Sequence, residues 1–581
     1  MRPWKADFYK VPLRHVCWLL LAVIAGTAIG FKIGLPGSGP AVSASAASAD
    51  EAAAGLSFAA PATGRRPVKA VGLYTGREAA VGLQPLSGVE GESLAVSGGS
   101  GSDALPGGGT PAVSYEAPYA RDLTFMAFPS GAAPPTSSTP TQTTTTTTTS
   151  SPAVPSGPPP SIADVRTVSV GPFSATLSWR TSEAATSRVV YGLDTPVLWS
   201  APTAAGTTHQ ATITGLTFSS TYHLDVTATT ADGRSAVSQF LLTTPALFGS
   251  VHATTGHGAI LLNGQPAFPK IVWNQCPDAV AGNLAVGIDL FMSNGCGSSA
   301  QLATWLSGSA FAVGDAQEQA AARAGSIGTF LPDEWDTHLP NDFTAADAAR
   351  LIPPSPGSGP RFLTLTNHFY SHAAPLPQGR GMYPALVATA DVLGFDLYPM
   401  QNWCRFDSFG DVFDSQLDLV AISRGKPTFQ WIEARRMDCS GAELDPTPET
   451  LRAESWLSIA GGAHAIGYFP NNWSATVGAE ITRTNHEIST LAPALLEPPI
   501  AASASLGSTI KVGARDHNGA VYVIAVNASR TSATATITIP ALVDRTLITL
   551  DGKYKVQAKD GAFSATFGPL EARVYIAAPA V

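Results

Sequence analysis

Short apolar runs alternate with longer amphipathic stretches through the part of the chain from about residue 250 to 497. Eight of these runs predict β-strands: Phe268 to Trp273, Gly287 to Phe291, Ala310 to Val313, Gly328 to Leu331, Phe362 to Thr366, Gly394 to Leu397, Thr428 to Ile432 and Ala465 to Phe469. Several stretches between them are compatible with helices, including Ala316 to Ala324 and Pro448 to Ile459. Eight strands alternating with helices over about 250 residues predict a (β/α)8 TIM barrel, an α/β fold.

A different pattern precedes the barrel, from about residue 161 to 246. Alternating apolar and polar positions predict strands at Ala175 to Trp179, Ser187 to Gly192 and His223 to Ala228. Trp179 in the second strand, the turn at Gly215 with Tyr222 shortly after it, and the late Asp232-Gly233 turn resemble a fibronectin type III domain. The resemblance implies a β-sandwich in which Tyr222 forms the tyrosine corner. We expect this module to act as a spacer, with a binding role as the alternative.

The helical pattern also disappears after the barrel, from about residue 498 to 581. Strands are predicted at Val521 to Asn527, Ala533 to Ile539 and Ala572 to Ile576, with a hairpin turn at Asp516 to Gly519 before the first. We therefore expect a small antiparallel β-sandwich packed against the barrel.

The first quarter of the chain has a composition unlike the rest. Residues 32–160 are mostly Ala, Gly, Ser, Pro and Thr, with a run from Thr143 to Thr149. Such a segment buries too little apolar surface to offset the entropy of ordering it, which predicts a disordered linker. Before it, an apolar run from Val16 to Phe31 follows the basic residues Arg2, Lys5, Lys10 and Arg14, so residues 1–31 are predicted to be either a signal peptide or an uncleaved membrane anchor. Both alternatives predict a secreted or cell-surface protein.

Composition narrows the classes of partner. Charged residues make up only 13% of the chain, hydrophobic residues 44%, and the net charge is −9 without a basic patch. This argues against a nucleic-acid partner, and we expect a monomer.

Four cysteines lie within the predicted barrel, and export makes disulfide bonds possible. They are Cys276, Cys296, Cys404 and Cys439, which allow three pairings. We favour Cys276–Cys296 and Cys404–Cys439, because each pair would join neighbouring loops of the barrel. Free buried thiols are the alternative.

Two glutamates follow predicted strands four and seven. Glu334 lies just past Gly328 to Leu331, and Glu433 directly follows Thr428 to Ile432. Barrel enzymes carry their active sites at the C-terminal ends of the strands, so both carboxylates are predicted to meet there. Two convergent carboxyl groups are the minimum apparatus for cleaving a glycosidic bond. The hydroxyl of Tyr398 could hydrogen-bond Glu433, and Trp473 could stack on a sugar.

These positions resemble the clan A glycoside hydrolases, and the predicted hairpin from Leu261 to Pro269 is similar to the segment that leads into the first barrel strand of that clan. The resemblance covers about residues 255–581. It implies that Glu334 is the acid/base and Glu433 the nucleophile of a retaining enzyme. One position departs from the clan: Asp333 stands where Asn commonly precedes the acid/base and contacts the substrate.

Other assignments of these residues stay open. Arg435 and Arg436 could place Glu433 in a structural ion pair, and Asp333 or Asp336 could supply the acid. Trp335 could line a subsite or belong to the core.

His368 and His372 are the only close histidine pair, but their place in a loop after a strand argues against zinc. His368 is a better candidate for contacting substrate hydroxyls, so we expect neither a metal nor a cofactor.

The resulting hypothesis is an exported, tethered retaining glycoside hydrolase whose partner is a polysaccharide or oligosaccharide. The alternative from another class is a non-catalytic surface protein that binds carbohydrate or mediates adhesion through a glycosidase-like barrel. A purely structural surface protein would leave the two glutamates unexplained.

Overall fold

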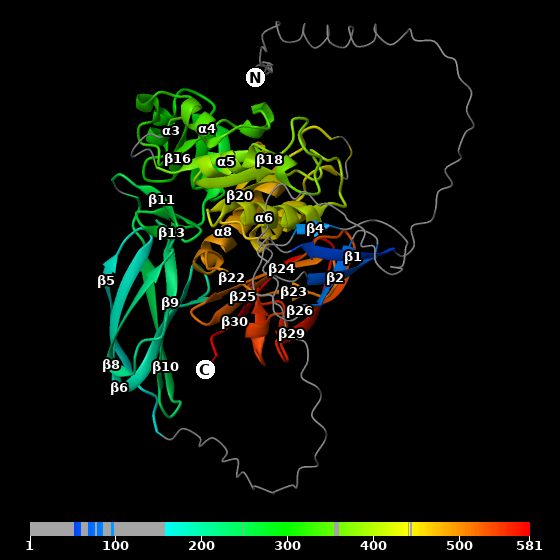
Figure 1. The fold of residues 1–581 in the computed structure, drawn as a ribbon. Coiled ribbons are helices and arrows are strands. Elements are labelled where there is room, and N and C mark those ends of the chain that lie inside the picture. The colour runs from blue at the N-terminus through cyan, green and yellow to red at the C-terminus, as the bar shows by residue number, and fades with distance from the viewer. Residues whose placement is uncertain are drawn as a thin grey trace, which may run out of the picture. The chain divides into compact units, whose positions relative to one another are not determined.

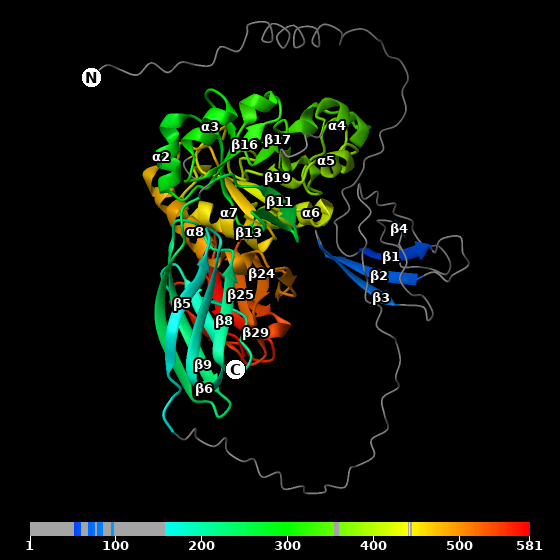
Figure 2. The same ribbon diagram turned by 90° about the vertical axis from the view of Figure 1, so that its left-hand side faces the viewer.

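The computed structural model describes side chains for residues 157–247, 249–353, 359–439, 441 and 444–580, and describes only the backbone of four strands closer to the N-terminus. These strands form an antiparallel sheet in the order β3-β2-β1-β4 (Figure 2): β1 (Ala52–Ala59), β2 (Val68–Thr75), β3 (Glu78–Gln84) and β4 (Ala95–Ser97). They fall in the segment 32–160, where no strands were predicted. The predicted signal peptide or anchor at 1–31 lies outside the described residues. Among the described helices, none is both long enough and apolar enough to cross a membrane.

Eight parallel strands form a closed ring, the barrel (Figure 1). Its members are β14 (Lys270–Gln275), β15 (Leu290–Asn294), β16 (Phe311–Asp315), β17 (Gly328–Phe330), β18 (Arg361–Thr366), β19 (Val392–Asp396), β20 (Thr428–Glu433) and β21 (Ala465–Phe469). Pairing of β14 with β21 closes the ring. Each strand overlaps one of the eight predicted apolar runs, so the predicted (β/α)8 barrel is confirmed.

Helices on the outside of the ring bury the outward-facing side chains of the strands. They are α2 (Pro277–Ala285), α3 (Ser299–Trp305), α4 (Ala345–Leu351), α5 (Tyr383–Thr389), α6 (Phe409–Ser423), α7 (Pro448–Ala460) and α8 (Ala475–Leu495). The helix predicted at Ala316 to Ala324 is wrong, because this stretch contains only the 3-10 turn η1 (Ala320–Arg323). The N–H of Ala316 donates to the carbonyl of Phe330 at 2.7 Å, which keeps the chain extended beyond the end of β16.

The β-structure before the barrel is built around one long strand. The 19-residue β6 (Ser174–Gly192) pairs with β5 (Ile162–Val170) and β8 (Gly206–Thr214) through its first half. Its second half pairs with β9 (Thr221–Thr230) and the short β7 (Leu198–Trp199), and β10 (Ser235–Thr243) pairs with β9.

The predicted tyrosine interaction is present in this module. Tyr222 is buried, and its hydroxyl accepts a hydrogen bond from the N–H of Thr217 at 2.8 Å. Trp179 is also buried and donates its indole N–H to the hydroxyl of Ser187 at 2.9 Å. The assignment to the fibronectin type III family stays a prediction.

Two antiparallel sheets follow the barrel. The larger sheet has the strand order β22-β24-β25-β30-β27-β28. Its strands are β22 (Pro499–Ile500), β24 (Ile510–His517), β25 (Ala520–Asn527), β30 (Ala572–Ala577), β27 (Thr546–Thr549) and β28 (Lys555–Gln557). The smaller sheet has the order β23-β26-β29, with β23 (Ser503–Ala504), β26 (Ala533–Thr538) and β29 (Ala562–Phe567).

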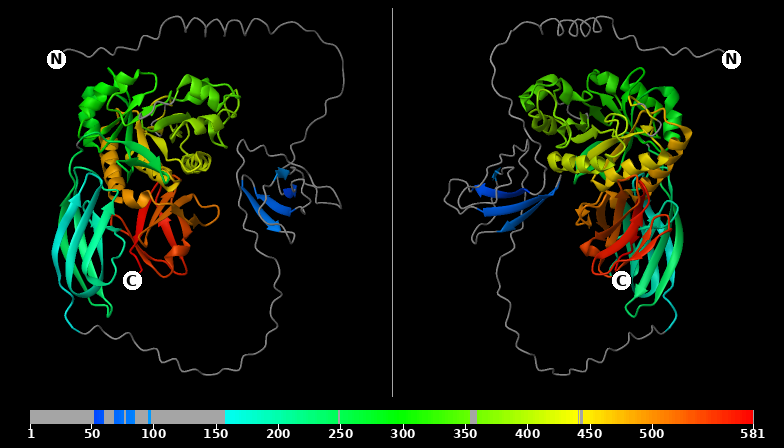
Figure 3. Two further views of the ribbon diagram at one scale, coloured as in Figure 1. Left: turned by 60° about the vertical axis from the view of Figure 1, so that its left-hand side comes forward. Right: turned by 90° about the vertical axis from the view of Figure 1, so that its right-hand side faces the viewer.

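This part of the chain contacts both of its neighbours. Helix α7 packs on β24 and β25, and helix α8 packs on β24 (Figure 3). The hydroxyl of Tyr522 donates to the carbonyl of Val197 in the first β-structure at 2.7 Å. Asn518 and Gly519 have positive φ angles, as a two-residue hairpin loop between β24 and β25 requires.

Glycines inside the ring make room for large side chains from the next strand. A Cβ atom at Gly394 on β19 would lie 2.0 Å from the ring of Phe429, and one at Gly467 on β21 would lie 2.3 Å from Trp431. Both aromatic residues are buried in the barrel interior. The filling of the barrel therefore depends on these two positions lacking a side chain.

Replacing Gly394 with Ala is expected to lower the free energy of unfolding by about 1–3 kcal/mol, because Phe429 must leave its rotamer. Gly282→Ala is the matched control, since no atom lies within 4 Å of its added methyl group in α2. Thermal or urea unfolding of both variants measures the difference. Equal stability of the two would show that the interior accommodates the extra carbon.

Candidate active site

Acidic side chains follow several strands at the C-terminal end of the barrel. Asp315 ends β16, Asp333 and Glu334 follow β17, Asp396 ends β19, and Glu433 ends β20. A closed parallel barrel brings the ends of all its strands to one rim, so residues far apart in sequence come together there.

Glu334 and Asp396 are in direct contact. The side-chain carboxyl of Asp396, a residue only 8% exposed, lies within hydrogen-bonding distance of the carboxyl of Glu334. Burial, followed by this contact, raises the pKa of Asp396 well above its usual value. Two touching carboxyl groups cannot both ionise readily, so the contact favours a proton on Asp396. The arrangement supplies one acid and one carboxylate side by side.

The backbone at Glu334 is strained. This residue has φ +44° and ψ +42°, in the left-handed region that non-glycine residues seldom occupy. It precedes the 3-10 turn η2 (Trp335–His338) and is half-buried. Strained residues concentrate at functional sites, where the surrounding structure holds them in place.

Asp336 provides that restraint. Its carboxylate accepts hydrogen bonds from the N–H of Thr366 at 3.2 Å, the hydroxyl of Thr366 at 2.5 Å and the hydroxyl of Tyr383 at 2.8 Å. Asp336 is fully buried, which removes it from contact with a substrate. It instead fixes the turn after β17 to the end of β18, and so fixes the position of Glu334.

Asp333 lies on the open side of the same cluster. The residue as a whole is exposed, while its carboxyl group is enclosed by protein atoms and other carboxylates. Desolvation first, and then the negative charge of Glu334, raise the pKa of Asp333 to about 7, with smaller effects from Asp336 and Asp315. Asp333 therefore changes charge near neutral pH.

Aromatic rings border the acidic cluster. Tyr398 is 7% exposed and stacks on Phe469 with ring centroids 6.1 Å apart, and Phe469 contacts Trp273 edge-to-face at 5.8 Å. Trp273 and Phe469 are only half-buried, and the enclosed indole N–H of Trp273 has no hydrogen-bond partner. Burial, and next the charge of Asp396, raise the pKa of Tyr398. The hydroxyl group therefore stays protonated.

Sequence reasoning missed three residues of this site: Asp396, Trp273 and Phe469. Each lies within a run that was predicted as a strand, at or next to its C-terminal end. That position was the available signal, because a barrel directs such side chains to the rim.

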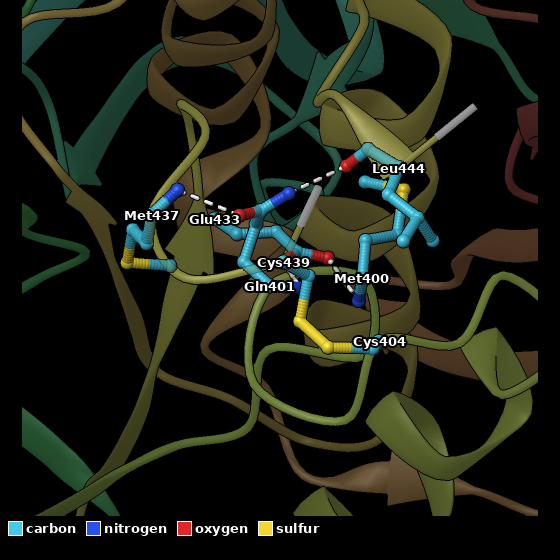
Figure 4. Close-up of a disulfide and its surroundings, with 7 residues drawn as sticks. All are labelled: Met400, Gln401, Cys404, Glu433, Met437, Cys439 and Leu444. Carbon is cyan, nitrogen blue, oxygen red and sulfur yellow. Dashed lines mark hydrogen bonds between the residues drawn. A yellow bond between two sulfur atoms is a disulfide. The ribbon is translucent and has the colours of Figure 1, made fainter. Parts of the chain in front are cut away.

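Glu433 has different surroundings. It is fully buried, and its carboxylate accepts hydrogen bonds from the N–H groups of Met400 at 3.0 Å and Gln401 at 2.9 Å (Figure 4). The side chain of Gln401 extends the network by donating to the carbonyl of Leu444 at 2.7 Å and accepting from the N–H of Met437 at 2.6 Å. Glu433 thus anchors the loop that follows Tyr398.

A second buried carboxyl group accompanies Glu433. Glu454 on α7 is 1% exposed, and its side chain lies within hydrogen-bonding distance of Glu433. Burial, followed by the charge of Glu433, raises the pKa of Glu454, and burial raises the pKa of Glu433 to about 7. If the pair shares one proton, one negative charge remains. The backbone N–H groups of Met400 and Gln401 stabilise that charge on Glu433.

The structure therefore gives Glu334 a different carboxyl partner from the one predicted. The described contacts of Glu433 are with Met400, Gln401 and Glu454, and the predicted hydrogen bond from Tyr398 is not among them. The assignment of Glu433 as nucleophile stays a prediction.

The arginines after β20 do not pair with Glu433. Arg435 donates to the carbonyl of Asn472 at 3.0 Å, and Arg436 forms an ion pair with Asp445, so the alternative of a structural ion pair with Glu433 is wrong.

Two of the other predicted substrate-binding residues pack against the protein. The ring of Trp473 lies against Gly478 and Tyr468 beside α8. Trp335 is 6% exposed and packs edge-to-face on Phe343, with ring centroids 5.6 Å apart.

His368 is also engaged within its own loop, where its Nδ1 atom is 2.7 Å from the carbonyl oxygen of Ala374. Within the described residues, no group of three or more His, Cys, Asp or Glu side chains is arranged to hold a metal ion.

Both favoured disulfide bonds are confirmed. Cys276–Cys296 joins the loops after β14 and β15, with Cα atoms 5.0 Å apart. Cys404–Cys439 joins the loops after β19 and β20, with Cα atoms 5.4 Å apart, next to the Glu433 network (Figure 4).

Comparison with known proteins gives no family for this chain. No protein-family model matches it, and no curated protein does. Among solved structures it is similar to a GH30 endoxylanase from Clostridium papyrosolvens (TM-score 0.34, 11% identity, covering 57% of this chain and 100% of that one). It is also similar to an α-amylase from Geobacillus thermoleovorans (0.38, 10%, 54% and 99%) and a β-glucuronidase from Faecalibacterium prausnitzii (0.31, 13%, 57% and 66%). Likenesses this distant do not define the chemistry, which rests on the side chains.

The Glu433–Glu454 pair makes stability depend on pH. Folding raises the pKa of Glu433 from 4.5 to about 7, so the folded state holds protons that the unfolded state releases. Stability is therefore expected to fall as pH rises between those values, by roughly 2–3 kcal/mol. Glu454→Gln keeps a donor to Glu433 and removes the second titrating group of the pair, so it should reduce the pH dependence of stability and stabilise the protein at pH 8.

Thermal unfolding of the wild type and Glu454→Gln at pH 5 and pH 8 measures the effect. Glu449→Gln, on an exposed position of the same helix, is the control. An undiminished pH dependence in Glu454→Gln would contradict the shared proton.

Proposed function

We propose that this protein hydrolyses O-glycosidic bonds of a polysaccharide or oligosaccharide with retention of configuration, using Glu334 and Asp396. The observation that carries the proposal is the contact between these two carboxyl groups, with a raised pKa on the buried one, at the rim of a (β/α)8 barrel. One protonated and one ionised carboxyl group are the two parts that glycoside hydrolysis requires.

Environment assigns the two roles. Asp396 is the more deeply buried group and keeps the proton, so it donates that proton to the leaving oxygen. Glu334, which is partly open to solvent, attacks the anomeric carbon and forms a glycosyl ester as the carbon–oxygen bond breaks. The ionised Asp396 then takes a proton from water, whose oxygen attacks the anomeric carbon and releases Glu334.

The closeness of the pair favours retention. Inverting enzymes separate their carboxyl groups by about 6.5–9.5 Å to admit a water molecule, whereas retaining enzymes keep them at about 5–5.5 Å. The contact between Glu334 and Asp396 is shorter than either separation and is therefore nearer to the retaining one. Half-buried Trp273 and Phe469 supply ring faces on which a sugar can stack.

The rest of the chain fits an exported enzyme of this kind. Two disulfide bonds and the N-terminal basic and apolar pattern support a secreted or cell-surface location. The module at 161–246 serves in this proposal as a fibronectin type III spacer, the protein acts as a monomer, and the reaction needs no cofactor.

The enclosure of Asp396 favours a second candidate, a barrel that binds carbohydrate without cleaving it. A leaving oxygen has to reach a side chain that is only 8% exposed. Sugar binding with no release of reducing ends by the wild type would select this candidate.

Glu334→Gln and Asp396→Asn are each expected to lower kcat by about 10²–10⁴-fold, because each removes one of the two reacting groups. Reducing-end release from a panel of glycans measures the activity, and NMR of the first-formed anomer tests retention. Asp342→Asn, at an exposed position of the barrel, is the control for loss of an acid.

Glu433→Gln distinguishes the two candidate pairings. It replaces an acceptor of two N–H groups with an amide, so a lower melting temperature is expected together with partial activity. An unchanged melting temperature with complete loss of turnover, and azide rescue of Glu433→Ala as a glycosyl azide, would make Glu433 the nucleophile instead.

Asp333→Asn tests the electrostatics of the pair. Removing a neighbouring negative charge makes the proton on Asp396 easier to lose, so its pKa falls. The alkaline limb of the kcat/KM profile is therefore expected to move to lower pH by about one unit. A limb that stays in place or moves to higher pH would show that Asp396 is not the group that titrates.

A further inference from the structure

Three basic side chains alternate along one face of β24, the strand of the C-terminal sandwich that packs against α7 and α8 (Figure 2). They are Lys511, Arg515 and His517, and they lie opposite to the side chains of β24 that fill the sandwich core. The outer two have acidic partners. Lys511 forms an ion pair with Asp414 at 2.8 Å, and Nδ1 of His517 lies 2.9 Å from a carboxylate oxygen of Glu497.

Arg515, between them, is the most deeply buried of the three and has no such partner. It is 3% exposed, and within the described residues its one hydrogen bond runs from Nη1 to the carbonyl oxygen of Ala514 at 3.0 Å. Its Nε–H is enclosed and has no acceptor. Burial lowers the pKa of Arg515 to about 10, which still leaves the guanidinium charged at neutral pH. A buried charge is strongly unfavourable unless an opposite charge accompanies it.

The titratable group on which the charge of Arg515 acts is a base, His464. Burial first, and then the charge of Arg515, lower the pKa of His464 to about 4, so its ring is neutral at pH 7. Nδ1 of the ring accepts a hydrogen bond from the N–H of Thr428 at 3.4 Å, which places the ring proton on Nε2. His464 therefore adds an N–H donor near Arg515 and no negative charge.

The two residues belong to different parts of the molecule that meet closely. A Cβ atom added at Gly513 on β24 would lie 2.4 Å from the carbonyl oxygen of Ala460, the last residue of α7. This contact fixes β24 against the segment that leads from α7 to His464, which directly precedes β21. Arg515 is thus held at the N-terminal end of the barrel, opposite to the rim with the carboxyl pair.

We propose that Arg515 binds a small inorganic oxyanion, phosphate or sulfate, at the junction of the barrel and the C-terminal sandwich. Because Nη1 is engaged with Ala514, Nε–H and Nη2–H remain, and these two parallel donors match two oxygens of an oxyanion. The anion supplies both the acceptor and the negative charge that the described residues do not provide. This site is independent of the proposed hydrolysis.

Thermal unfolding of the full-length protein at pH 7 tests the proposal. Sodium phosphate or sodium sulfate replaces NaCl from 0.1 to 10 mM at constant ionic strength. A ligand that binds only the folded state should raise the melting temperature with the logarithm of its concentration, here by about 2–5 °C. Calorimetric titration should show one oxyanion per chain, and the salt with the larger effect identifies which oxyanion the site prefers.

Variants locate the effect at Arg515. Arg515→Met removes the charge, so it should abolish the dependence on oxyanion and should not destabilise the protein in chloride, where the wild type holds an uncompensated buried charge. Lys559→Met is the control, because it removes a positive charge from an exposed position of the same sandwich. It should respond to phosphate as the wild type does.

The outcomes are decisive in both directions. A rise in melting temperature that Arg515→Met abolishes supports the site, whether or not the protein cleaves a glycan. No rise on exchanging chloride for either oxyanion, a rise that Arg515→Met retains, or no saturable binding by calorimetry overturns it. Should Arg515→Met fail to fold, Arg515→Lys decides: it keeps the charge but loses the parallel donors, so binding should weaken about tenfold, and unchanged binding overturns the proposal.

Discussion

The contact between the carboxyl groups of Glu334 and Asp396 is the interaction on which the proposed chemistry depends. Two such groups repel when both are ionised, so holding them together costs free energy that the fold must supply. The closed barrel supplies it by bringing the ends of β17 and β19 to one rim. Burial at this rim, followed by the contact with Glu334, raises the pKa of Asp396.

Two networks hold this arrangement in place. Asp336 binds Thr366 and Tyr383 and so fixes the strained turn that carries Glu334. Glu433 binds the N–H groups of Met400 and Gln401 and fixes the loop after Tyr398. Both anchors are buried acids at the same end of the barrel, and their hydrogen-bond partners distinguish them from the Glu334–Asp396 pair. Backbone N–H and hydroxyl donors bind both anchors, whereas the partner of the Asp396 carboxyl is another acid, Glu334.

The hydrogen-bond partners of these acids explain how much of the site the sequence could predict. Glu334 was found because it follows a strand, and the same reasoning selected Glu433, which also ends a strand. Some carboxylates at strand ends reach the open rim, and others are covered by the next loop. The position of the residue on its strand does not distinguish the two cases. Asp396 was passed over because it lies within an apolar run, and Trp473 was chosen for its type although its ring packs beside α8. Both disulfide bonds were predicted correctly, because the loops they join are neighbours in any barrel of this strand order.

The sequence by itself determined the positions of the eight barrel strands, helix α7, a few strands of the two flanking β-structures and the Asn518-Gly519 hairpin. These depend on local periodicity and turn chemistry, which the chain carries from residue to residue. The tertiary structure decided which acids touch, which acquire raised pKa values and which only anchor loops. Those properties depend on contacts between strand ends and loops tens of residues apart, and on the burial that creates them. A local sequence pattern indicates neither these contacts nor this burial.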